Sequence, residues 1–134
     1  MGELMTDASK MVFSGADSYL RAAMSGLAAR QRTIANNVAN VDTPGFKASE
    51  VRFEDTLKAA VSRGKSGASV DQTSLNASTS RSTLVDATTT RADGNNVDID
   101  REMELLGEAN LNYSAMTQVM STRLGILRNV ISGR

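Results

Sequence analysis

The sequence predicts an all-α fold in which an N-terminal and a C-terminal helix pair as an antiparallel, coiled-coil-like hairpin. Two runs of apolar residues, one near each end of the chain, support this prediction because each follows the alternating four- and three-residue spacing of a helical seam. Between them, a short extended and helical piece is followed by a long polar stretch that predicts a flexible loop.

The first helix is predicted over residues 14–41. Residues 1–13 have weak apolar periodicity, and we expect this N-terminus to be mobile. The helix should begin near Ser14 because Ser14 and Asp17 form a Ser-x-x-Asp arrangement that can cap a helix. Its seam is apolar except for one glutamine and consists of Leu20, Met24, Leu27, Gln31, Ile34, Val38 and Val41.

The first helix is predicted to end in an asparagine-rich segment that contains the only proline of the chain. Pro44 sets the φ angle needed at the second position of a tight turn, and Gly45 tolerates the positive φ of the third, so residues 43–46 predict a type II turn. The residues alone leave two interpretations open, a simple helix end or a functional motif. The segment comprises Asn36, Asn37, Asn40, Asp42, Thr43, Pro44, Gly45, Phe46 and Lys47.

The middle of the chain is predicted to be mostly irregular. Within residues 42–61, Val51 and Phe53 alternate with polar residues and predict a short extended piece, and apolar residues from Phe53 to Val61 then space as one face of a short helix. Residues 62–97 are dominated by small polar residues. Their few large apolar side chains cannot offset the entropy of ordering the segment, so we expect a flexible loop.

The C-terminal helix is predicted over residues 98–134. Acidic residues crowd its first turns and arginines lie towards its end, as the helix dipole favours. Its seam comprises Ile99, Met103, Leu106, Asn110, Tyr113, Thr117, Met120, Leu124, Leu127 and Ile131. A second apolar stripe comprises Ala109, Met116, Val119, Ile126 and Val130. One partner helix cannot cover both stripes, which favours self-association or assembly over a monomeric hairpin.

A register follows if the polar residues of the two seams pair. Gln31 and Asn110 each occupy an a position, and a buried amide is tolerated best opposite another amide. Placing these two residues level in an antiparallel pair brings apolar residues together, although the second stripe could serve instead. The predicted apolar neighbours are Leu27 with Tyr113, Ile34 with Leu106, and Leu20 with Met120.

Composition argues against most catalytic and binding functions. The chain has no cysteine and no histidine, which removes disulfides, the usual zinc ligands, thiol nucleophiles and triads that need an imidazole base. Formal charge is zero and aromatic residues make up only 4%, so we expect no nucleic-acid partner. No apolar run is long enough for a membrane span. We therefore expect a protein that is not an enzyme, with no cofactor and no metal.

Two runs resemble a known family. The segment ANNVANVDTPGFKASEVRFEDTL, residues 35–57, resembles the N-terminal signature of flagellar rod and hook proteins, most of all a proximal rod protein. The segment NNVDIDREMELLGEANLNYSAMTQVMSTRLGILRNVI, residues 95–131, is similar to the C-terminal helix of the same family. The chain departs from the family in a longer start before Ser14 and in Val41, where alanine is more usual.

The resemblance implies a structural subunit of the bacterial flagellar basal-body rod. In that family the terminal helices form the inner layer of a tubular, torque-transmitting shaft around the export channel. The implied partners are further copies, other rod subunits, the rod-base adaptor, the membrane ring and the export gate. The implied location is the periplasmic rod, reached by export without a cleaved signal peptide. The alternative function is a soluble helical adaptor or export chaperone that binds a partner helix.

Overall fold

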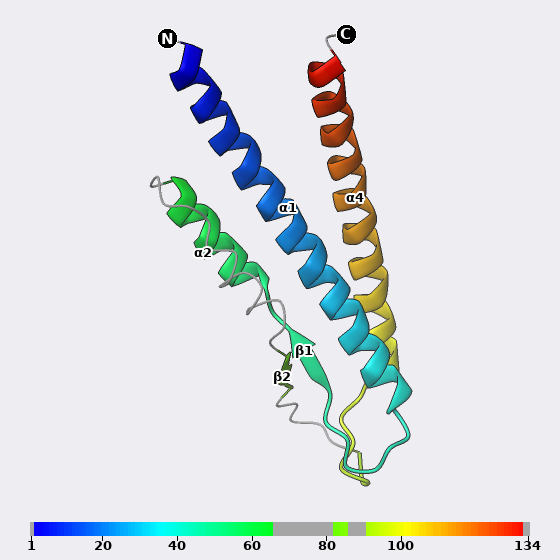
Figure 1. The fold of residues 1–134 in the computed structure, drawn as a ribbon. Coiled ribbons are helices and arrows are strands. Elements are labelled where there is room, and N and C mark those ends of the chain that lie inside the picture. Colours follow the sequence, from blue (N-terminus) through cyan, green and yellow to red (C-terminus); the bar gives the residue numbers. More distant parts are fainter. Residues whose placement is uncertain (1, 66–81, 86–90, 133–134) are drawn as a thin grey trace.

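The computed structural model describes residues 2–65, 82–85 and 91–132 and contains a long helical hairpin. In chain order its elements are α1 (Gly2–Ala39), β1 (Ser49–Val51), α2 (Glu54–Lys65), β2 (Ser82–Leu84) and α4 (Ile99–Ser132). Helices α1 and α4 pack against each other and run in opposite directions, so both termini lie at the same end of the molecule (Figure 1). This arrangement confirms the predicted all-α hairpin.

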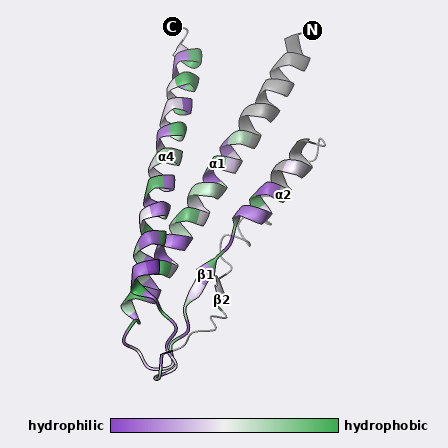
Figure 2. Ribbon diagram, turned by 180° about the vertical axis from the view of Figure 1, so that it is seen from behind, coloured by the Kyte–Doolittle hydropathy of each residue, from purple (hydrophilic) through white to green (hydrophobic). Residues whose placement is uncertain are grey.

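A smaller arm packs on α1, which lies between the arm and most of α4. The arm consists of α2 and a two-stranded antiparallel sheet, and it lies beside α1 in opposite views of the molecule (Figures 1 and 2). In this sheet Ser49 of β1 pairs with Leu84 of β2, and Val51 pairs with Ser82. Helix α1 is therefore the central element, because it contacts α4, β1 and α2.

The first helix begins earlier than predicted. Helix α1 starts at Gly2, includes the N-terminal stretch that was expected to be mobile, and passes Ser14 without a break. Residues 3–11 include several strong helix formers, and extending an existing helix costs far less than nucleating one. The Ser14 arrangement therefore does not start a helix. The other end differs less, because α1 ends at Ala39 rather than at residue 41.

The stretch predicted as one flexible loop, residues 62–97, contains regular structure. Residues 62–65 complete α2, residues 82–84 form β2, and residues 91–97 bond to the turn that follows α1. Residues 66–81 and 86–90 lie outside the described residues. The prediction underestimated this stretch because its order comes from hydrogen bonds to distant segments rather than from its own few apolar side chains.

The core lies where α1 meets the arm. It consists of buried Ala22, Ala23, Leu27, Val51, Phe53 and Leu57, and partly buried Tyr113 and Met116 of α4 pack against it. Full burial of a side chain as large as Phe53 contributes about 1.5–3 kcal/mol. In the part of the chain that is described, no helix has both the length and the apolar character of a membrane span.

Candidate functional site

The predicted seam of α1 faces packed side chains. Leu20, Leu27 and Ile34 are buried, with exposed fractions of 7%, 4% and 4%. The remaining seam positions are half-buried: Met24, Gln31, Val38 and Val41. The positions from Leu20 to Val38 lie on the buried side of α1 because the apolar spacing matches the helical repeat, and Val41 follows the end of the helix.

The seam of α4 is only partly the one predicted. The half-buried members are Leu106, Tyr113, Met120 and Leu127. The exposed members are Ile99, Met103, Asn110, Thr117, Leu124 and Ile131. Instead, the residues just before Met103, Asn110, Thr117 and Leu124 are buried or half-buried, namely Glu102, Ala109, Met116 and Arg123. The contact face is thus rotated towards part of the second stripe, whose Val119, Ile126 and Val130 remain exposed.

Polar contacts between the helices show the register. The Gln31 side-chain amide donates a hydrogen bond of 2.7 Å to the Asn110 amide oxygen. Nearer the termini, Asp17 and Arg123 form an ion pair at 2.8 Å. The residue that is earlier in α1, Asp17, pairs with the residue that is later in α4, Arg123. The helices are therefore antiparallel, with Gln31 opposite Asn110, as predicted. Asn110 is exposed, however, so this is not the buried amide pair that the sequence suggested.

The turn after α1 has the geometry that its residues predict. Gly45 has a φ of 72°, and the Phe46 N–H donates to the Thr43 carbonyl at 3.2 Å. Both features belong to a type II turn. A Cβ atom at Gly45 would meet nothing within 4 Å, so the need for glycine comes from the backbone angle and not from crowding. Most of the motif is accessible, with exposed side chains at Asn36, Asp42, Thr43, Pro44 and Lys47.

Asn95 closes the end of α1 from a distant part of the chain. Its side-chain N–H groups lie within 2.9–3.0 Å of the carbonyl oxygens of Asn40, Val41 and Thr43. Its amide oxygen accepts a 2.7 Å hydrogen bond from the Val97 N–H. The last carbonyl groups of a helix have no partner within the helix, and Asn95, which is 0% exposed, supplies partners for carbonyls at this end.

Further hydrogen bonds make residues 40–48 and 91–97 one unit, which we call the loop junction. The Gly45 N–H donates to the Asp93 carbonyl at 2.8 Å, and the Lys47 ammonium group donates to the Gly94 carbonyl at 2.8 Å. Gly94 also has a positive φ, of 80°, and approaches the backbone of Gly45. Asn96 links the junction to the sheet, because its side chain accepts from the Ala48 N–H and donates to the Val85 carbonyl.

Asn37, one of the predicted motif residues, joins three elements. Its amide oxygen accepts from the Ser49 N–H of β1 at 3.0 Å, and its N–H groups donate to the Ser49 carbonyl at 2.8 Å and to Glu102 Oε1 of α4 at 3.1 Å. Asn37 is 1% exposed. Burial raises the pKa of Glu102 above its ordinary value, although the Asn37 hydrogen bond and the nearby Arg101 oppose that shift.

Several residues of this site were not singled out in the sequence. Arg30 lies over the Phe53 ring, with its guanidinium carbon 5.0 Å from the ring centre, and bonds to the Val51 carbonyl and to Glu54. Asn95 and Asn96 follow Gly94, and this Gly-Asn-Asn run is a turn signal that could have directed attention to them. The role of Arg30 has no local signal, because its partners lie in another segment.

Comparison with known proteins identifies the family. A model of the family described as flagella basal body rod protein matches residues 20–47, which include the α1 seam and the turn. The chain is 34% identical over 126 residues to the flagellar basal body rod protein FlgB of Bacillus subtilis (strain 168), covering 91% of this chain and 97% of the relative. The chain belongs to the FlgB family of flagellar basal body rod proteins.

Other FlgB proteins show similar agreement. FlgB of Salmonella typhimurium (strain LT2) is 33% identical, with 79% of this chain and 85% of the relative covered. FlgB of Borrelia hermsii is 37% identical, with 71% and 79% covered. As a member of the FlgB family the chain is a structural subunit of the flagellar rod, and none of these relatives favours the adaptor or chaperone alternative.

Proposed function

We propose that this rod subunit assembles through its two long helices into the tubular, torque-transmitting shaft of the proximal rod, around the export channel. Its partners are further copies and other rod subunits, together with the rod-base adaptor, the membrane ring and the export gate. The chain reaches this periplasmic position by export without a cleaved signal peptide. In this proposal the chain has no catalytic role.

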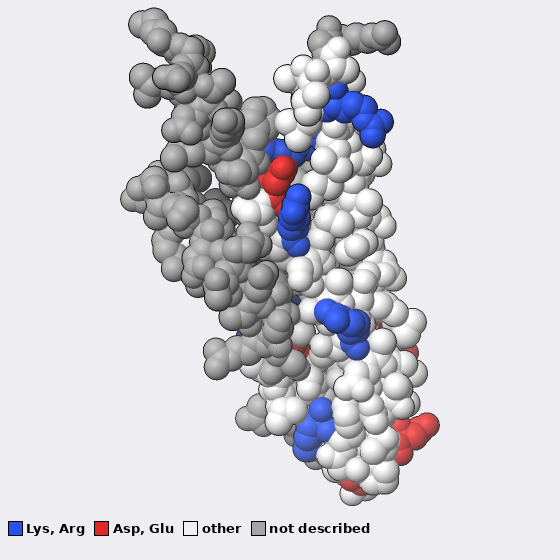
Figure 3. All heavy atoms as spheres, viewed as in Figure 1, with Lys and Arg blue, Asp and Glu red and all other residues white. Residues whose placement is uncertain are grey.

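The observation that supports assembly most directly is the apolar surface of α4. Eight large hydrophobic side chains of this helix are at least 46% exposed: Ile99, Met103, Leu111, Val119, Leu124, Ile126, Val130 and Ile131. Hydrophobic residues occur along the whole of α4 (Figure 2), and much of its surface in Figure 3 is uncharged. Extended apolar surface on a small protein is typical of an interaction site, because covering it removes apolar area from water.

The loop junction has a supporting role in this proposal. It fixes the start of α4 to the end of α1, through the contacts of Asn95 with Asn40, Val41 and Thr43. The two helices can then present their outer faces as one unit, which a shaft that transmits torque requires. Contacts between different faces of neighbouring copies, repeated without closing into a ring, generate a helical tube.

Glutamate substitutions on the outer face of α4 test the proposal. Val119→Glu places a charge where an apolar contact is expected, at a cost of several kcal/mol if a neighbouring subunit buries it. Gln118→Glu adds the same charge at the adjacent exposed position. In cells whose only copy is the variant, we expect Val119→Glu to abolish swimming and the assembly of rods seen by electron microscopy. We expect Gln118→Glu to retain both.

The folded subunit itself should be unchanged by either substitution, since both side chains are exposed. Circular dichroism of the purified variants checks this point. Normal swimming by Val119→Glu cells would contradict the role of this face. Recovery of the wild-type chain in a discrete cytoplasmic heterodimer, and not in purified basal bodies, would instead favour the adaptor or chaperone alternative.

A further inference from the structure

One buried carboxyl group lies at the point where α1, β1 and α4 meet. Glu102 is 7% exposed and contacts Asn37, which in turn bonds to Ser49 of β1. We propose that the protonation state of Glu102 controls how firmly the first turns of α4 are held against α1 and β1. When protonated, Glu102 stays docked against Asn37, and when ionised it moves into the neighbouring pocket and loosens the first turns of α4.

The hydrogen bonds at Glu102 suit a neutral acid better than a carboxylate. Oε1 accepts one hydrogen bond from Asn37 at 3.1 Å, whereas Oε2 is buried and has no hydrogen-bond partner in the part of the chain that the structure describes. An ionised carboxylate needs partners on both oxygens, and burying a charge without them is unfavourable. Protonation of Oε2 removes that charge without disturbing the bond to Asn37, and a buried neutral O–H group without a partner costs less than a buried charge.

Charged groups from all three elements surround Glu102. Arg101 of α4 favours its ionisation, whereas Asp98, just before α4, and Glu50 of β1 oppose it. Arg30 of α1 lines the same pocket, but its guanidinium group is already occupied by the Val51 carbonyl and by Glu54. Among the described residues that line the pocket, Arg101 is therefore the cation that can receive an ionised Glu102.

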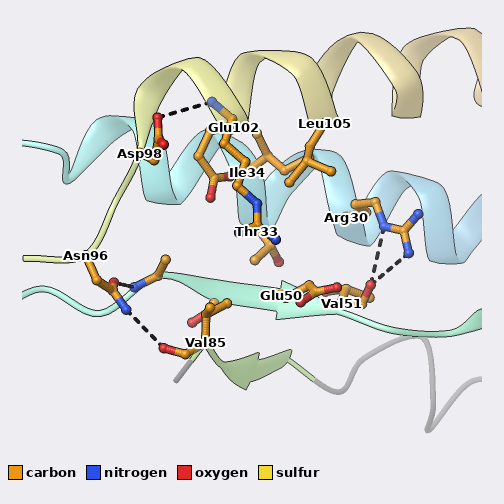
Figure 4. A pocket seen from close by; sticks show the side chains of 13 residues that line it. Arg30, Thr33, Ile34, Glu50, Val51, Val85, Asn96, Asp98, Glu102 and Leu105 are labelled. Atoms are coloured by element: carbon orange, nitrogen blue, oxygen red, sulfur yellow. Dashed lines mark hydrogen bonds between the residues drawn. The ribbon is translucent and has the colours of Figure 1, made fainter. Parts of the chain in front are cut away.

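A pocket beside Glu102 gives the ionised side chain somewhere to go. The pocket has a volume of about 220 Å³ and lies between α1, β1 and α4 (Figure 4). Polar residues including Thr33, Asn96 and Arg101 contribute to its walls. A carboxylate that rotates into this space can be hydrated and can approach Arg101, so ionisation should loosen the start of α4 without unfolding the whole hairpin.

The sign of the pH effect follows from burial. Burial raises the pKa of Glu102 in the folded chain above its ordinary value. The folded chain then holds this proton more tightly than the unfolded chain does. The contribution of Glu102 to stability is therefore fully present below the ordinary pKa of a glutamate, and it is lost as pH rises through the raised pKa of the folded state.

Two glutamine variants separate this effect from the titration of other carboxyl groups. Glu102→Gln has nearly the shape of the protonated acid, and Glu104→Gln removes the same charge at an exposed position on the same helix. The experiment measures urea unfolding of the full chain between about pH 3 and pH 8, the range over which a raised glutamate pKa titrates. The wild-type unfolding midpoint should fall relative to Glu102→Gln as pH rises, and Glu104→Gln should follow the wild type.

A second measurement needs no variant. Carbon-13 NMR of the Glu102 carboxyl group in the wild-type chain should give a titration midpoint above the ordinary glutamate value. Amide exchange over residues 100–106 should become faster above that midpoint, after correction for intrinsic rates. An ordinary or lowered midpoint would overturn the proposal. So would a stability difference between wild type and Glu102→Gln that does not change with pH, or an equal effect of Glu104→Gln.

Discussion

Replacing Asn95 with alanine removes the side chain that closes the end of α1. The alanine variant loses the donor contacts to the carbonyls of Asn40, Val41 and Thr43 and leaves the Val97 N–H without its 2.7 Å acceptor. An amide group has only two hydrogens, so we count two donated bonds and one accepted bond. At about 0.5–1.5 kcal/mol for each, the variant should lose about 1.5–4.5 kcal/mol of unfolding free energy.

Aspartate at the same position makes the test sharper. Asn95→Asp keeps the oxygen that accepts from the Val97 N–H but replaces the donor group with a charged oxygen facing three carbonyls. Because that oxygen repels the carbonyl dipoles and cannot donate, Asn95→Asp should be less stable than Asn95→Ala at neutral pH. If the Asn95 side chain only filled space, Asn95→Asp would instead be more stable than Asn95→Ala, because aspartate has nearly the volume of asparagine.

Urea unfolding of the full chain, followed by circular dichroism, measures both losses. Asn129→Ala is the control, because Asn129 is an exposed asparagine on α4 and alanine is the better helix former. If Asn95→Ala unfolds within about 0.5 kcal/mol of Asn129→Ala, which is the usual range of surface substitutions, Asn95 does not hold the loop junction together.

Two further predictions concern the turn and the register. Gly45→Val should abolish swimming, because a β-branched residue is strained at a φ of 72°, whereas Gly45→Asn should be tolerated; normal swimming by Gly45→Val cells would show that this turn geometry is not needed. Cysteines at Ile34 and Leu106 in this cysteine-free chain should crosslink in assembled rods, and cysteines at Leu20 and Leu106 should not; the reverse result would disprove the register.

The sequence was sufficient where the determining interactions are local. The turn at Pro44 and Gly45 follows from the φ angles that these two residues allow, and the buried face of α1 follows from its apolar spacing. The pairing of Gln31 with Asn110 was also accessible, because each residue interrupts an apolar seam. The evidence for the turn and for the α1 face lies within one segment. The evidence for the pairing is a polar residue that interrupts the apolar seam in each of two segments.

The sequence was insufficient where distant segments decide the structure. The periodic pattern of α4 allows more than one contact face, because apolar residues occur on several sides of the helix. The face that packs is the one that brings Ala109 close and places Glu102 against Asn37, and neither contact is visible in the spacing of α4 alone. The order of residues 91–97 likewise depends on carbonyl groups some fifty residues away, such as that of Val41.

Gly26 gives a last test of how the arm is held on α1. A Cβ atom at this position would lie 2.5–2.7 Å from three carbons of the Phe53 ring, which is closer than side chains can approach. The ring has little room to move, because it is 5% exposed and lies against Arg30. Alanine at Gly26 should therefore force the ring and β1 away from α1, and overpacking of this kind costs about 1–3 kcal/mol.

Alanine is a better helix former than glycine, and this gain partly offsets the overpacking cost of Gly26→Ala. A second glycine in a helix is therefore needed for comparison. Gly107→Ala, in α4, meets nothing within 4 Å and should gain the roughly 1 kcal/mol by which alanine exceeds glycine in a helix. Gly26→Ala receives the same gain, so the difference in unfolding free energy between the two variants isolates the contact with Phe53. We expect Gly26→Ala to be less stable than Gly107→Ala by about 1–3 kcal/mol in urea unfolding. Equal stability would mean that the arm can shift away from α1 at no cost, and that Phe53 does not fix its position.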